Sequence, residues 1–192
     1  MQQNIDFVAG VYDVPAGELE ARRSALLERA ALASASSRPA SQLSGGMRRK
    51  LGFSMAAVHA PELLVLDEPS TGVDPVSRID LWRLVTQAAA AGAAVVMSTT
   101  YLDEAERAAS LVILDRGRVL AQGPVDDVLR GFDGVVVRTP EAARPEWSWR
   151  RGRDLHELWD AGAAPADADV VVPDLEDVVV ALSLRSRAGV PL

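Results

Sequence analysis

The sequence contains no cysteine, a single lysine and only two histidines, and each scarcity excludes a class of chemistry. Without cysteine the chain has no disulfide, no thiolate metal ligand and no cysteine nucleophile. With imidazoles only at His59 and His156, the composition argues against a zinc site. The lysine, Lys50, follows Arg49 rather than a glycine, which bears on phosphate binding below.

Long apolar runs are also absent. No stretch approaches the ~20 apolar residues that a membrane-spanning helix needs, and the N-terminus lacks the basic start and apolar core of a secretory signal. With 192 residues, 48% hydrophobic and 24% charged, the sequence is typical of a soluble globular domain with a small appendix. The net charge of −7 argues against a nucleic-acid partner, because phosphate binding needs a basic stripe.

Hydrophobic periodicity and turn residues predict helices that alternate with strands. Helices are predicted over 17–34, 47–59, 75–90, 101–109 and 124–129. Strands are predicted over 63–66 and 93–98, and 111–115 with 118–121 should form a hairpin. This alternation predicts an α/β fold with a largely parallel sheet.

The character of the sequence changes after residue 132. A strand is predicted within 134–140, another over 170–172, and a final helix over 175–185 that Asp174 caps. Residues 140–168 show no clean period, and three of the four tryptophans lie there beside arginines. We interpret this strip as part of a small packed subdomain rather than a nucleic-acid surface. The predicted domains are therefore 1–132 and an accessory α/β region, 133–192.

Two segments carry candidate chemistry. The first is LSGGM, in which Ser44, Gly45 and Gly46 precede a predicted helix. Glycines let backbone N–H groups approach an anion, and the helix N-terminus adds partial positive charge. Alone, this pattern is more often an ordinary turn and helix cap.

The second segment is LLVLDEP, a predicted buried strand that ends in two adjacent carboxylates. Ligand sites of open α/β sheets lie at the carboxyl ends of the strands. There, Asp67 is expected to hold Mg²⁺, and Glu68 is expected to polarise the attacking water in phosphoryl transfer. For this motif alone, a strand ending in a solvated acidic turn is about as common.

The order of the motifs is more specific than either one. After LSGGM and LLVLDEP come TGVD, at residues 71–74, and STTYLDEAE, at residues 98–106. This ordered set resembles the ATP-binding-cassette (ABC) ATPases over about residues 1–131. LSGGM resembles the family signature, LLVLDEP its Walker B strand with the catalytic glutamate, TGVD its D-loop and STTYLDEAE its switch region. The sequences of these D-loop and switch segments resemble those of the drug and polysaccharide exporters.

The resemblance implies a P-loop NTPase-like ABC cassette that binds ATP and Mg²⁺ and drives transport. It implies nucleotide-binding roles for Ser44, Gly45, Gly46 and Asp74. Its expected partners are a second ABC ATPase domain in a head-to-tail dimer and transmembrane permease subunits, with no nucleic acid. The expected location is cytoplasmic, peripheral on the inner face of the cell membrane.

The sequence departs from the family pattern at two points. No GxxxxGK[ST] segment, the Walker A loop, occurs in the chain, so we expect the cassette to be N-terminally truncated, without the Walker A strand and loop, and inactive alone. The switch histidine is replaced by Thr100, which is shorter and cannot become cationic.

Two other readings stay open at this level. One is a non-catalytic remnant or regulatory half-cassette, which both departures favour. The other is a non-transport ABC protein acting on nucleic acid, against which the TGVD form of the D-loop and the absence of sustained heptads argue.

Overall fold

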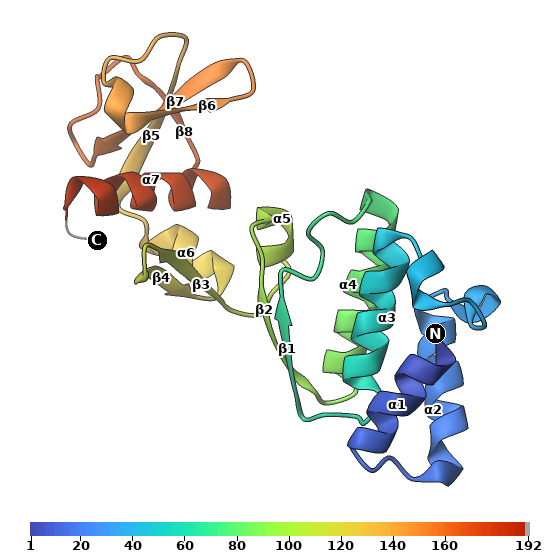
Figure 1. Ribbon diagram of the computed structural model, residues 1–192. Helices are drawn as coiled ribbons and strands as arrows, with labels where there is room; N and C mark the ends of the chain where they lie inside the picture. Colours follow the sequence, from blue (N-terminus) through green and yellow to red (C-terminus); the bar gives the residue numbers. More distant parts are fainter. Residues whose placement is uncertain (191–192) are drawn as a thin grey trace. The chain divides into compact units, whose positions relative to one another are not determined.

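The computed structural model describes residues 1–190, and the chain folds as two compact units, Met1–Thr100 and Tyr101–Leu192. Four helices and two strands build the first unit (Figure 1). They are α1 (Gln2–Val11), α2 (Ala16–Arg29), α3 (Gly45–Ala57), β1 (Leu63–Asp67), α4 (Pro75–Ala90) and β2 (Ala94–Ser98). Short 3₁₀ turns at Ala33–Ala35 and Ala40–Gln42 join α2 to α3.

Strands β1 and β2 pair in parallel, with Asp67 directly opposite Ser98. One face of this pair packs into the core of the unit through Leu64, Leu66, Val95 and Met97. On the other face, Leu63, Val65 and Val96 are 54%, 70% and 59% exposed. In the described residues β2 pairs only with β1, so no strand is hydrogen-bonded to its other edge.

The core of the first unit lies between the sheet and helices α1 to α4. Trp82 on α4 is buried there. Lys50 is buried between α3 and α4, and its Nζ lies 3.1 Å from Asp80 Oδ2. A buried ammonium needs such a partner, so the lysine of this chain ties two helices together.

The second unit begins with α5 (Leu102–Ala105) and a hairpin of β3 (Leu111–Asp115) and β4 (Arg118–Gly123). Arg116 and Gly117 both have positive φ, 49° and 77°, as a tight hairpin turn requires. Helix α6 (Val125–Gly131) follows and packs on β4. These elements agree with the sequence, except that the helix predicted over 101–109 ends at Ala105.

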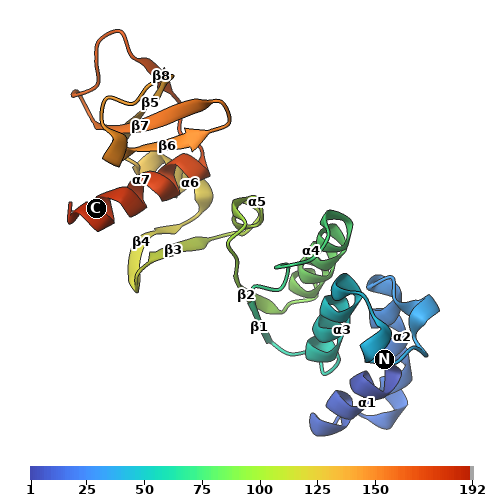
Figure 2. The ribbon, with the colours of Figure 1, turned by 45° about the horizontal axis from the view of Figure 1, so that its top comes forward.

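The rest of the second unit is an antiparallel sheet of order β6-β7-β5-β8, with α7 packed beside it (Figure 2). The elements are β5 (Gly134–Thr139), β6 (Ser148–Arg151), β7 (Asp154–Asp160), β8 (Asp169–Val171) and α7 (Leu175–Ala188). Asp174 caps α7 with a full capping box, and Gly189 ends it in the left-handed conformation. The cap at Asp174 is therefore confirmed.

Sequence reasoning missed α1, β6 and β7. Helix α1 buries only Ile5 and Ala9 and exposes Phe7 and Val11, so it has no clean apolar stripe. Strand β6 has four residues, too few to show a period. The α/β class is confirmed, with the parallel pairing confined, among the described residues, to β1 and β2. The assignment of 1–132 to one domain stays a prediction.

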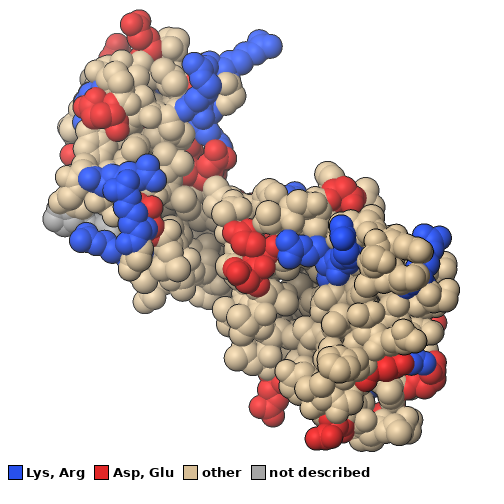
Figure 3. Space-filling model, in the orientation of Figure 1, with Lys and Arg blue, Asp and Glu red and all other residues tan. Residues whose placement is uncertain are grey.

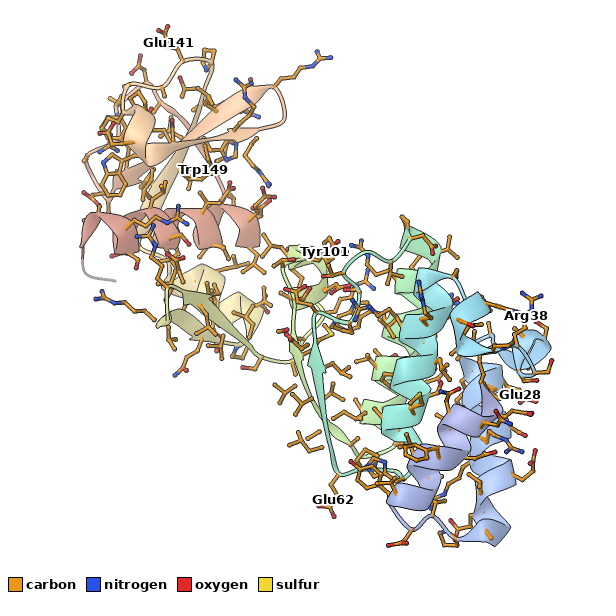
Figure 4. The ribbon with its side chains drawn as sticks, in the orientation of Figure 1. Glu28, Arg38, Glu62, Tyr101, Glu141 and Trp149 are labelled. Carbon is orange, nitrogen blue, oxygen red and sulfur yellow. The ribbon has the colours of Figure 1, made fainter. Side chains whose placement is uncertain are left out.

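No local sequence pattern indicates a partner for His156, but the structure gives it one. Its Nδ1 lies 2.8 Å from Oδ1 of the buried Asp177 on α7. The same oxygen accepts a hydrogen bond from Trp149 Nε1 at 3.3 Å (Figure 4 labels Trp149). Asp177 accepts these bonds because α7 packs its acidic first turn against β6 and β7, so the tryptophan–arginine strip belongs to a packed subdomain, as predicted.

Acidic and basic side chains are interspersed on the face drawn in Figure 3, and neither unit shows an extended basic stripe there. Within residues 1–190, every helix is too short or too polar to cross a membrane.

Candidate nucleotide site

The two adjacent carboxylates of the site lie at the carboxyl end of β1. Asp67 is the last residue of the strand and is exposed. Its Oδ1 accepts a hydrogen bond of 2.6 Å from the hydroxyl of Ser98, which ends β2 directly opposite. The parallel pairing of two strands thus fixes the orientation of the carboxylate predicted to hold a metal.

Glu68 follows in a turn with φ of 44°, a left-handed conformation that is unusual for a residue other than glycine. Its Oε2 accepts a hydrogen bond from Thr71 Oγ1 at 2.6 Å and a long one from Thr100 Oγ1 at 3.5 Å. The structure therefore brings Thr100, the residue at the switch position of the resemblance, beside Glu68. The contacts are hydroxyl bonds, because threonine offers no imidazole.

Ser44 caps helix α3. Its side-chain oxygen accepts a hydrogen bond from Met47 N at 3.2 Å, and the helix begins at Gly45. This geometry is that of an ordinary N-cap, and it leaves the first backbone N–H groups of a 13-residue helix at an exposed loop. Those groups supply the partial positive charge that an anion would meet.

The two glycines of the signature differ in their surroundings. A Cβ on Gly46 would lie 2.5 Å from Ser77 Oγ, 2.6 Å from Ser77 Cβ and 3.3 Å from Asp74 Oδ2. A Cβ on Gly45 would make only an ordinary 3.8 Å contact. Gly46 is therefore required for the close approach of the α3 and α4 N-termini, a packing reason that the sequence did not reveal.

Asp74 caps α4 by accepting a hydrogen bond from Ser77 N at 2.9 Å. Hydrogen bonds from the Ser77 backbone and side chain hold the pKa of Asp74 below its ordinary value. Asp74 thus stays ionised and lies next to Gly46. The predicted D-loop and signature residues are neighbours within one unit.

A cleft of about 600 Å³ lies between the start of α3, the end of β1 and the D-loop. Its lining includes Gly45, Arg48, Arg49, Asp67, Thr71 and Gly72. The helix N-terminus and both arginines bring positive charge to it, and Asp67 brings a carboxylate. This combination suits a phosphate chain with a divalent cation.

The donor set near Asp67 fits Mg²⁺ rather than an all-protein metal cage. Within residues 1–190, no group of three or more histidines, aspartates or glutamates could hold a metal. Mg²⁺ is usually held by one or two carboxylates together with water and substrate phosphates. The exposed Asp67 carboxylate meets that requirement.

Sequence reasoning assigned no individual role to Ser98 or Thr71, although both lie in segments that it singled out. The available signal for Ser98 was its position: it is a hydroxyl residue at the end of a predicted strand, next to the strand that ends in the two carboxylates. For Thr71, the signal was its spacing of three residues after Glu68.

Comparisons with known proteins agree with the geometry. Residues 1–71 match the family described as ABC transporter. The chain is 38% identical over 146 residues to the daunorubicin resistance ATP-binding protein DrrA3 of Streptomyces coeruleorubidus, covering 74% of this chain and 46% of that protein. It is 35% identical over 198 residues to the Nod factor export ATP-binding protein I of Rhizobium etli, covering 98% of this chain and 59% of that one.

A solved structure titled as the ATP binding subunit of an ABC transporter superimposes with a TM-score of 0.62 at 34% identity. The superposition covers 68% of this chain and 55% of that one. The chain therefore spans about half the length of the relatives it matches. The ordered motifs, the family match and this structural likeness together show that the chain belongs to the ABC transporter ATPase family.

Proposed function

We propose that this chain is part of the ATP-binding and ATP-hydrolysing motor subunit of an ABC-type exporter. The observation that carries the proposal is the acid pair at the carboxyl end of β1, where the hydroxyl of Ser98 bonds Asp67 and those of Thr71 and Thr100 bond Glu68. The relatives named for drug resistance and for Nod factor export support the transport role.

In this proposal the two carboxylates have different tasks. Asp67 holds Mg²⁺, directly or through water, and when bound the ion neutralises charge on the nucleotide phosphates. Glu68 orients the attacking water and accepts its proton on the carboxylate. The bonds from Thr71 and Thr100 to Oε2 hold that carboxylate in place.

The signature end contributes to the nucleotide of another cassette. Ser44, Gly45 and Gly46 present backbone N–H groups and a hydroxyl from the N-terminus of α3, and Asp74 lies beside them. We propose that these residues face the phosphates of an ATP that a second ABC ATPase domain holds in a head-to-tail dimer. Transmembrane permease subunits complete the assembly, which places the chain on the inner face of the membrane.

A non-catalytic role as a regulatory half-cassette is the second candidate. It is favoured by Thr100, which offers Glu68 a hydroxyl where the resemblance expects an imidazole. In that role the chain would supply a signature face and no hydrolytic site of its own. The two candidates differ in whether Glu68 affects turnover.

The test uses a relative that carries GxxxxGK[ST] and whose own signature serine is replaced by arginine, so that it binds ATP without completing a site. We expect addition of the wild-type chain to restore ATP hydrolysis and the Ser44→Arg chain to fail. In a cassette completed with GxxxxGK[ST], loss of turnover with Glu68→Gln would favour the hydrolytic role, and retention the regulatory one. If the wild-type chain restores no hydrolysis at any concentration, the proposal is wrong.

A further inference from the structure

Ser98 occupies the point where the two strands of the first unit end together. It is the last residue of β2 and lies directly opposite Asp67, the last residue of β1. Its hydroxyl donates to Asp67 Oδ1 at 2.6 Å and accepts from the backbone N–H of Glu68 at 2.9 Å. One oxygen atom therefore contacts both members of the acid pair.

The Glu68 backbone explains why that contact matters. A residue other than glycine with φ of 44° is strained, and such a conformation persists only when its surroundings hold it. The N–H of Glu68 points at two acceptors, the Ser98 hydroxyl at 2.9 Å and the Ser98 carbonyl at 3.2 Å. Both belong to Ser98, so this residue holds the main chain at the turn that aims the glutamate.

We propose that Ser98 is a positioning residue for phosphoryl transfer, because its hydroxyl couples the orientation of the metal-holding carboxylate to the backbone of the water-polarising glutamate. The inference rests on the proposed function and adds a residue to it. A hydroxyl has one donor and two acceptor lone pairs, and this site uses the donor on Asp67 and an acceptor on Glu68 N–H. Threonine can make both bonds, whereas valine, nearly the same shape, can make neither.

Thr71 does not duplicate this role. Its hydroxyl contacts only the Glu68 side chain, at 2.6 Å, and comes from the same turn three residues later. Ser98 comes from the neighbouring strand, 31 residues from Asp67. It therefore joins the acid pair to the sheet, and its loss should affect metal binding as well as the glutamate.

The test compares Ser98→Thr and Ser98→Val with the wild type in a cassette completed with GxxxxGK[ST], and the two variants are a matched pair that differs in the hydroxyl. The first readout needs no nucleotide and is amide hydrogen exchange at Glu68. We expect Ser98→Thr to match the wild type and Ser98→Val to exchange roughly fivefold faster, the factor for one lost neutral hydrogen bond. The urea midpoint of each variant establishes that the comparison is made on folded protein, and Ser98→Ala replaces Ser98→Val if the latter does not fold.

The second readout uses Mn²⁺ as the probe, with ATP, in the same completed cassette. Electron paramagnetic resonance measures the Mn²⁺ affinity, and steady-state assays separate kcat from KM for ATP. We expect Ser98→Val to weaken Mn²⁺ binding and lower kcat, each by about 10- to 100-fold, as for other residues that orient a metal ligand. The threonine variant should restore both values.

The outcomes are distinct. Faster exchange in Ser98→Val with unchanged Mn²⁺ affinity and kcat would overturn the inference, because Ser98 would then be structural only. Unchanged exchange would overturn it as well. A wild-type completed cassette without Mn²⁺–ATP affinity would refute the proposed function instead, and the exchange comparison would still decide whether Ser98 holds the Glu68 turn.

Discussion

Replacing Gly46 by alanine should destabilise the first unit, although alanine is the better helix former. Gly46 is the second residue of α3, and a Cβ there would lie 2.5 Å from Ser77 Oγ and 2.6 Å from Ser77 Cβ. Contacts below 3 Å cannot persist, and Cβ is fixed to the backbone rather than being the end of a flexible side chain. The start of α4 or the start of α3 must therefore move.

Two opposing terms set the magnitude. Alanine gains up to ~1 kcal/mol over glycine in a helix interior, and less in the first turn. Overpacking of this kind costs roughly 1–3 kcal/mol. The shift also disturbs Asp74, which is 3.3 Å from the new Cβ and caps α4. We therefore expect a net loss of about 1–2 kcal/mol in the free energy of unfolding for Gly46→Ala.

The matched control is the preceding residue. Gly45 occupies the same helical turn, and its Cβ would meet only Gly72 O at 3.8 Å. Gly45→Ala should be neutral or stabilising by up to ~0.5 kcal/mol. Adjacent glycines of one motif are thus expected to respond with opposite signs to the same substitution.

Urea unfolding of a cassette completed with GxxxxGK[ST] measures both effects, and a double-mutant cycle identifies the cause. Ser77→Gly removes both clashing atoms, so the Gly46→Ala, Ser77→Gly protein should show a favourable coupling of about 1–2 kcal/mol between the two sites. Equal destabilisation by Gly45→Ala and Gly46→Ala would refute the packing argument. A coupling near zero would refute it too.

Three further substitutions test other parts of the first unit. Lys50→Met, which leaves Asp80 without its ammonium partner, should lower the free energy of unfolding by about 2–4 kcal/mol in urea titration, and Lys50→Met with Asp80→Leu should recover most of it. In a cassette completed with GxxxxGK[ST], Glu68→Gln should keep ATP binding and lower turnover by about 10²–10⁴, and unchanged steady-state ATPase activity would remove Glu68 from the base role. In the same protein Thr100→His should raise ATPase activity, and no increase would mean that this side chain does not limit turnover.

Strong local signals made much of the first unit predictable. Helix α4 has the predicted bounds because Asp74 and Pro75 mark its start, and β1 is an apolar run between prolines. Helix α1 and strands β6 and β7 were missed because tertiary packing, rather than a periodic pattern, determines them. The pairing of His156 with Asp177 joins residues 21 positions apart, and no local pattern reports such a contact.

The sequence predicted which residues form the candidate site better than it predicted the contacts that hold them there. Asp67, Glu68 and Thr100 were named from ordered motifs, and the structure brings Thr100 to Glu68. Their roles in catalysis remain predictions. The sequence suggested that Gly46 frees space for an anion, whereas the structure shows Ser77 in that space. Ser98 was hidden because its importance depends on the register of two strands rather than on its neighbours in sequence.

The free edge of β2 determines how the chain should behave by itself. Within the described residues this strand pairs only with β1, and residues 93–98, AAVVMS, carry no charge and no proline. Such an edge is a template for intermolecular pairing. We therefore expect the chain alone to aggregate, to remain soluble beside a partner cassette and to show no useful Mg–ATP affinity by calorimetry, since it contains no Walker A loop.

Introducing a lysine on the exposed or on the buried face of β2 tests whether its free edge causes aggregation. Val96 is 59% exposed, whereas its neighbour Val95 packs on the core of the unit. Val96→Lys should keep the fold and raise the soluble fraction, because a lysine on an edge strand opposes pairing between chains. Val95→Lys should unfold the unit, because it buries an ammonium without a partner. A wild-type chain that is a soluble monomer with cooperative unfolding would contradict the predicted aggregation. If Val96→Lys leaves sedimentation unchanged, the edge of β2 does not cause aggregation, and a partner cassette does not keep this chain soluble by covering that edge.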